Sequence, residues 1–101
     1  MAIISPGELT FIQLVGQYFL AQKGRGLQLS AADLALVRSW EEQGAPARVV
    51  CAGIKEAFEA YRRVHGPEAR TPGSLAYCRK AVERALRSWR EARVGNRDDE
   101  R

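Results

Sequence analysis

The side chains best suited to catalysis or metal binding are one histidine and two cysteines. His65 is the only histidine, and Cys51 and Cys78 are the only cysteines. An imidazole or a thiolate can serve as a base, a nucleophile or a zinc ligand, but only with partners at a suitable spacing. No cysteine or carboxylate stands at a metal-ligand spacing from His65, and the chain offers no second histidine to activate a thiol. We therefore expect no catalytic residue, no metal, no cofactor and no small-molecule substrate, and hence a protein that is not an enzyme.

Two groups of acids and the two thiols have simple structural interpretations. Glu41-Glu42 ends a predicted helix, and Asp98-Asp99-Glu100 lies in the last residues of the chain. General acid catalysis needs a carboxyl group whose pKa is raised by desolvation or by a like charge, so we interpret both groups as solvated. Cys51 and Cys78 each lie among apolar helical neighbours, which favours two buried thiols over a disulfide.

Helical periodicity and capping residues predict the first two helices. A serine cap followed by a first-turn proline predicts a helix over residues 5–22. The two glycines within residues 23–26 are expected to end it. Ser30 with Asp33 resembles a capping box with aspartate in place of glutamate, and it predicts a second helix over residues 31–43.

Glycine and proline also mark the second half of the chain. Gly44 is expected to end the second helix, and Pro46 then lies in the first turn of a third, amphipathic helix. Gly53 would let another helix approach this third helix closely. After a loop over residues 65–70, Thr71 with its following proline is expected to cap a fourth helix.

Composition favours one small helical domain. The chain has 101 residues, of which 46% are hydrophobic and 28% charged, as in ordinary globular proteins. We predict an all-α fold, a compact bundle of about four helices over residues 1–94, followed by a polar, disordered tail over residues 95–101. No apolar run approaches the roughly 20 residues that cross a bilayer, and no basic segment precedes an apolar one at the start. A cytoplasmic location without membrane contact is therefore expected.

Basic residues are concentrated in the predicted fourth helix. The net charge is +4. Lys80, Arg84 and Arg87 fall on one helical face, opposite an apolar seam that runs from Cys78 to Trp89. Such a stripe can follow a phosphate backbone, or it can be the solvated outer face of a helix, and both interpretations stay open. The candidate nucleic-acid-binding residues are Arg79, Lys80, Arg84, Arg87 and Arg90, with Tyr77 and Trp89 available to stack on bases if they are exposed rather than in the core.

The predicted first helix is apolar around nearly its whole circumference. Phe11, Leu14 and Tyr18 make its apolar stripe wider than a core of this size needs. An apolar face larger than the core can cover is typical of a contact with a second copy or another protein. These three residues are the candidate partner-binding site, and a dimer is one expected outcome.

Four segments of the sequence contain helix caps, glycines and apolar residues at fixed spacings and in a fixed order. They comprise Gly26-Leu27-x-Leu29-Ser30-x-x-Asp33-Leu34-x-x-Val37-x-x-Trp40, then Gly44, then Val49-Val50-x-x-Gly53-Ile54-x-x-Ala57-Phe58, and finally Ser74-Leu75-x-Tyr77-x-x-x-Ala81-Val82. This order resembles the C-terminal domain of the DnaD family, the bacterial and phage replication-initiation and primosome proteins. The resemblance implies a helical module that binds single-stranded or duplex DNA through its last helix and its tail.

The end of that resemblance includes one departure. The family's terminal motif is a tyrosine, an aliphatic residue four positions later and a tryptophan four positions after that. Tyr77 and Ala81 take the first two places, Ala85 stands at the third, and Trp89 follows one turn later. Two hypotheses follow: a DNA-binding accessory module of DnaD-like type in DNA replication, or an adaptor for protein–protein interaction or self-assembly.

Overall fold

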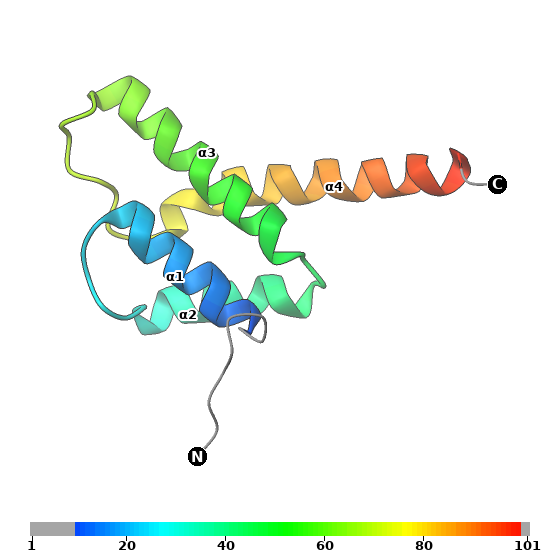
Figure 1. Cartoon of the computed structure of the whole chain (residues 1–101), viewed down its shortest axis with the longest axis horizontal. Coiled ribbons are helices and arrows are strands. Elements are labelled where there is room, and N and C mark those ends of the chain that lie inside the picture. The colour runs from blue at the N-terminus through cyan, green and yellow to red at the C-terminus, as the bar shows by residue number, and fades with distance from the viewer. Residues whose placement is uncertain (1–9, 100–101) are drawn as a thin grey trace, which may run out of the picture.

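The computed structural model describes the backbone of residues 10–99 and the side chains of residues 10–93. Within that part of the chain there are helices and no strands, which confirms the predicted all-α fold class. The helices are α1 (Phe11–Lys23), α2 (Ala31–Glu42), α3 (Ala47–His65) and α4 (Arg79–Asp99), with a short 3-10 helix, η2 (Leu75–Cys78), leading into α4 (Figure 1).

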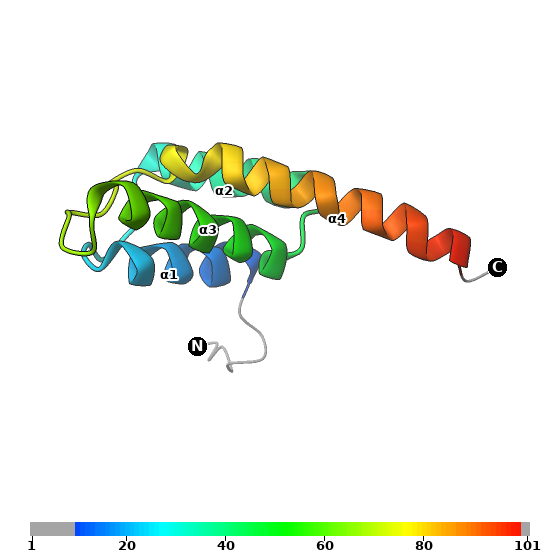
Figure 2. The same cartoon turned by 90° about the horizontal axis from the view of Figure 1, so that it is seen from above.

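The long helix α3 lies in the middle of the bundle. Its most extensive packing is against α4, and it also packs against α1, while α2 contacts α1 and η2. Figure 2 shows α3 between α1 and α4. Over the described residues, no helix has the length and apolar character that would let it cross a membrane.

The helix α4 is longer than predicted. It continues to Asp99, past residue 94, where the polar tail was expected to begin, and residues 100–101 lie outside the described part. Figures 1 and 2 both show its C-terminal half extending beyond the other helices. Only the first half of α4 therefore has a neighbouring helix along its inner side.

The core is apolar and contains side chains from all the helices. Phe19 of α1 meets Phe58 of α3 edge to face, with ring centroids 6.0 Å apart. This geometry is the one that aromatic pairs favour. The largest fully buried side chains are Trp40, Phe19, Phe58, Ile54, Leu75 and Leu86.

The two longest helices cross at Gly53. A Cβ atom at this position would lie 2.6 Å from the Cα of Val82 and 3.0 Å from its backbone nitrogen. Side-chain movement cannot relieve an overlap with backbone atoms, so the crossing requires glycine. The prediction that Gly53 admits a closely packed helix is confirmed.

The start of α1 differs from the prediction. Thr10 is the N-cap in an extended conformation, and α1 begins at the next residue. The N–H of Gln13 donates to Thr10 Oγ1 over 3.1 Å, and the Thr10 N–H donates to Gln13 Oε1 over 2.9 Å. This capping box satisfies two backbone donors at once. The prediction of one helix over residues 5–22 is wrong, and its cap and proline at residues 5 and 6 lie outside the described residues.

Left-handed glycines follow α1 and α2 as predicted. Gly24 has φ 79° and its N–H donates to the carbonyl of Leu20. Gly44 also has φ 79°, and its N–H donates to Glu41 O over 3.0 Å. These bonds satisfy carbonyl groups that a helix end leaves without partners.

The approach to α4 is built differently from the expected threonine cap. Ser74, not Thr71, is the N-cap, since its hydroxyl accepts from the N–H of Ala76 and η2 follows it. The Thr71 hydroxyl instead donates to Lys23 O over 2.7 Å and accepts from Arg25 Nη1 over 2.8 Å. Thr71 therefore ties the loop before η2 to the end of α1.

Asp33 is a buried acid that joins two distant helices. Its backbone N–H donates to Ser30 Oγ over 3.0 Å, as the predicted cap requires. Its carboxylate does not return to Ser30, however, because Oδ1 accepts from the N–H of Leu75 over 3.0 Å. Asp33 is only 4% exposed. The capping-box prediction is thus correct for Ser30 and wrong for the Asp33 side chain, which instead holds the start of η2.

Candidate functional site

The candidate basic residues lie together on one side of α4, here called the outer face. All of them are exposed: Arg79, Lys80, Arg84, Arg87 and Arg90. The opposite side of the same segment contributes Cys78, Val82 and Leu86 to the core. Helical geometry explains the division, since positions three, four and seven residues apart share a side of a helix.

Lys80 and Arg87 lie near the middle of the outer face. Seven residues of α-helix advance about 10 Å along the axis and return to nearly the same side. Glu83 and Glu91 are the acids exposed on the same described stretch of α4. The outer face therefore has five cations against two carboxylates and is positive overall.

Three of the five cations have a polar partner. Arg79 Nε lies 3.8 Å from Glu83 Oε2, one helical turn away. Arg90 Nη2 donates to Gln43 Oε1 over 3.3 Å, across to the end of α2. The third, Arg84, pairs with Glu56 of α3. Among the described side chains, Lys80 and Arg87 form no ion pair or hydrogen bond.

The two aromatic candidates lie in different environments. Tyr77 is 49% exposed, and its ring meets Tyr61 edge to face with centroids 5.5 Å apart. Trp89 is half-buried against the core, and the Arg93 guanidinium lies 4.9 Å from its ring centroid. Tyr77 is thus accessible for stacking, whereas Trp89 lies on the seam side of α4, away from the outer face.

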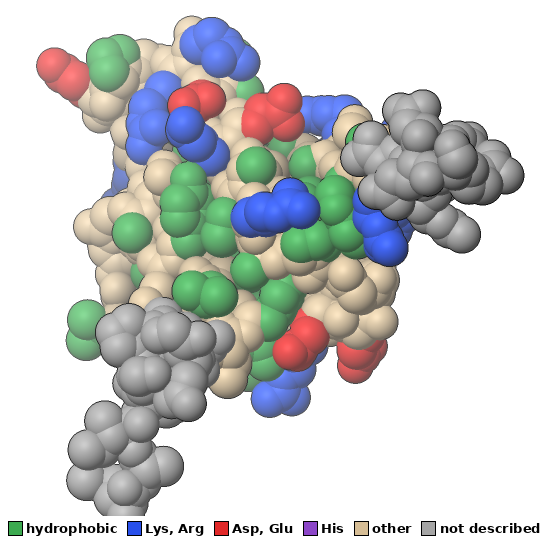
Figure 3. Space-filling model, turned by 45° about the vertical axis from the view of Figure 1, so that its right-hand side comes forward, with side chains coloured by type: hydrophobic (Ala, Val, Ile, Leu, Met, Phe, Trp, Pro, Cys, Tyr) green, Lys and Arg blue, Asp and Glu red, His purple; other side chains and the backbone are tan. Residues whose placement is uncertain are grey.

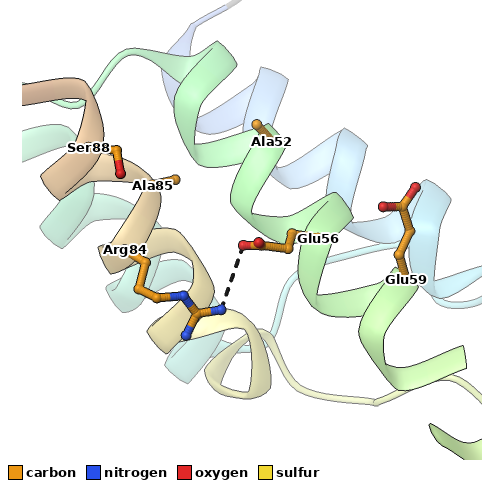
Figure 4. A pocket seen from close by; sticks show the side chains of 6 residues that line it. All are labelled: Ala52, Glu56, Glu59, Arg84, Ala85 and Ser88. Carbon is orange, nitrogen blue, oxygen red and sulfur yellow. Dashed lines mark ion pairs between the residues drawn. The ribbon is translucent and has the colours of Figure 1, made fainter. Parts of the chain in front are cut away.

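A groove of about 540 Å³ runs between α3 and α4. Its lining residues are Ala52, Glu56, Glu59, Arg84, Ala85 and Ser88 (Figure 4). Glu56 and Arg84 reach toward each other across it, with Arg84 Nη2 3.6 Å from Glu56 Oε1. The groove thus places the acids of α3 beside one edge of the outer face. Nothing in the sequence pattern predicts this arrangement, because it depends on how α3 and α4 pack.

The candidate partner-binding residues of α1 are only partly covered. Phe11 and Tyr18 are half-buried against the core, while Leu14 is 41% exposed. Burial raises the pKa of Tyr18, whose hydroxyl accepts a hydrogen bond from Gln22 Nε2 over 3.2 Å. Figure 3 shows one face of the molecule, without assigning it to a helix, on which hydrophobic side chains gather among Lys, Arg, Asp and Glu.

The thiols and the histidine do not form a reactive cluster. Cys51 and Cys78 are free thiols, as predicted, but only Cys78 is buried, and Cys51 is half-buried. Burial raises the pKa of both, and that of Cys78 rises to about 12 with a smaller contribution from nearby Asp33. His65 is exposed and stacks on Tyr61 with centroids 4.2 Å apart. Over the described residues, no three His, Cys, Asp or Glu side chains gather in a way that could hold a metal ion.

Comparison with known proteins places the chain in a family. Neither the curated proteins nor the solved structures contain a match to it. A family model does match, over residues 6–98, and its description is "Uncharacterised protein". The match spans nearly the whole chain, including every candidate residue of α1 and α4. The chain therefore belongs to this family of uncharacterised proteins.

Proposed function

We propose that the protein is a non-enzymatic helical module that binds nucleic acid through the outer face of α4. The observation that carries the proposal is the exposure of five cations on one side of a helix whose other side is core. The resemblance of the sequence to the DnaD family supports a more specific proposal, that the ligand is DNA and the process is replication.

Phosphate contact is the chemistry that such a face supports. Lysine and arginine that neutralise phosphates release condensed counterions, which favours binding at low salt without regard to base sequence. Lys80 and Arg87 have no competing partner among the described side chains, so they are the contacts expected to matter most. Tyr77 lies at the N-terminal end of this face, where an unpaired base could stack on it.

The test is a fluorescence anisotropy titration at low salt with labelled single-stranded and duplex oligonucleotides. The double variant Lys80→Ala, Arg87→Ala should bind about tenfold more weakly than the unchanged protein, because two phosphate contacts are lost. The matched control is Arg48→Ala, Arg63→Ala, which removes the same charge from exposed positions of α3. It should bind within about twofold of the unchanged protein.

Two outcomes would contradict the proposal. One is the absence of any anisotropy change with protein on the order of 100 μM, the weak end of non-specific binding. The other is an equal loss of affinity in the α4 and α3 double variants, since that would reflect net charge rather than a defined face.

The alternative is a module for protein–protein interaction or self-assembly through α1. The exposed Leu14 between half-buried Phe11 and Tyr18 favours it. Sedimentation velocity should then show a dimer that Leu14→Glu dissociates, because a charge would be buried in the contact. Ser88→Glu also adds a charge at an exposed position, but on α4, which lies on the other side of α3 from α1, so it should leave the dimer intact. A strictly monomeric unchanged protein would contradict self-assembly.

A further inference from the structure

The side of the outer face that adjoins α3 differs electrostatically from the rest. Arg84 is 60% exposed as a side chain, yet its guanidinium lies 3.6 Å from the carboxylate of Glu56, itself 56% exposed. Glu59 lines the same groove farther along α3 (Figure 4). Arg84 is therefore the outer-face cation that borders the groove, whose α3 side carries Glu56 and Glu59.

Glu56 affects a phosphate near Arg84 in two ways. It competes with the phosphate for the guanidinium, and its negative charge repels the phosphate directly. Glu83 differs, because it lies on α4 itself and pairs with Arg79 within one turn. For a nucleic acid bound on the outer face, an acid on α3 would oppose the spreading of its backbone from α4 into the groove.

We infer that Glu56 is a positioning residue that holds Arg84 back from phosphates and so confines a nucleic acid to Lys80, Arg87 and Arg90. The inference rests on the proposed function. Exposed ion pairs are weak and do not prevent Arg84 from moving, so Glu56 modulates the affinity and does not abolish it. The nucleic-acid path then follows the axis of α4 and does not cross toward α3.

The experiment compares Glu56→Gln with Glu59→Gln in the same anisotropy titration over a range of salt concentrations. Both variants remove one negative charge from α3 beside the groove, and the two side chains have similar exposure, 56% and 50%. Glu59 pairs with Lys55 over 3.9 Å, so it does not restrain Arg84. It is therefore the matched control for the general effect of charge.

Glu56→Gln should bind about threefold more tightly than the unchanged protein. Its log–log salt slope should be steeper by a fraction of the roughly 0.9 that one whole contact contributes, because Arg84 contacts phosphate in a larger share of the complexes. Glu59→Gln should keep the original slope. Combined with Arg84→Ala, the Glu56→Gln change should add no further slope, since the residue through which it acts is gone.

Each remaining outcome has a distinct meaning. If the unchanged protein binds but Glu56→Gln behaves like Glu59→Gln, the inference is overturned and the proposed function stands. The inference is also overturned if Glu56→Gln steepens the slope equally without Arg84. If the unchanged protein binds no oligonucleotide at low salt, the proposed function and the inference fail together.

Discussion

The side of α4 that packs against α3, here called the inner side, is constrained by close packing, whereas the outer face is not. The inner side meets α3 so closely that Gly53 has no room for a methyl group beside Val82. The outer side carries cations whose partners, where present, lie 3.3 to 3.8 Å away at exposed positions. Close packing is sensitive to one methyl group, whereas exposed charge pairs contribute little to folding. We expect changes on the inner side to alter stability and changes on the outer side to alter binding.

The largest effect is expected at the helix crossing. Gly53→Ala should lower the free energy of unfolding by about 3 kcal/mol, because the added carbon overlaps backbone atoms of α4. Urea denaturation followed by circular dichroism measures this. The control is Gly73→Ala, whose added carbon would meet only a side-chain atom, Arg25 Nη2, at 3.3 Å, so that the cost is at most the hydrogen bond from this atom to Thr71 O. Equal stability of the two variants would contradict the close crossing.

The next largest effect is expected at the buried acid of α2. Asp33→Ala removes the acceptor for the N–H of Leu75 and should cost about 2 kcal/mol, the penalty for leaving a buried donor without a partner. Asp33→Asn retains a side-chain oxygen and should recover part of that loss. If the asparagine variant is no more stable than the alanine variant, the hydrogen bond is not what makes Asp33 important.

A smaller effect is expected from the thiol of Cys78 at alkaline pH. Burial raises its pKa from 9.0 to about 12 in the folded protein. As the pH rises above 9, the thiol ionises in the unfolded chain while it stays protonated in the folded protein, and this ionisation favours the unfolded chain. The stability contributed by the buried neutral thiol is therefore fully present below pH 9 and is lost as the pH rises from 9 toward 12. The free energy of unfolding should fall by about 1 kcal/mol between pH 9 and 10 from this group. Cys78→Ala should show a shallower decline, and an unchanged decline would be contrary evidence.

The smallest effect on folding is expected on the outer face. Lys80→Ala with Arg87→Ala should change the free energy of unfolding by less than about 0.5 kcal/mol, because neither side chain has a partner to lose among those described. The same denaturation measurement applies. A destabilisation as large as that of Gly53→Ala would show that the outer face is structural.

Local signals predicted the helices better than the contacts between them. The caps at Ser30 and the glycines after α1 and α2 act within one turn, so the sequence specifies them directly. The start of α1 differs from the prediction because Ser5-Pro6 and Thr10 are both plausible caps, and the reciprocal contact between Thr10 and Gln13 favours Thr10. The predicted role of Thr71 is wrong for a different reason: its partners, Lys23 and Arg25, come from a distant part of the chain.

The candidate site was predictable to a similar degree. Helical spacing placed Lys80, Arg84 and Arg87 on one side of α4, but it could not decide whether Tyr77 or Trp89 is exposed. That depends on which neighbours cover each ring, and Trp89 proved half-buried. The pairing of Glu56 with Arg84 depends on the α3–α4 crossing, a tertiary feature that periodicity does not encode.

The central claim is that the outer face of α4 binds nucleic acid through its phosphates. The most direct measurement is the log–log dependence of duplex affinity on salt for the unchanged protein and for the Lys80→Ala, Arg87→Ala variant. We predict a slope that is about 1.8 units shallower in the variant, one increment of about 0.9 for each lost contact. Identical slopes for the two proteins, or no binding by the unchanged protein at low salt, would contradict the claim.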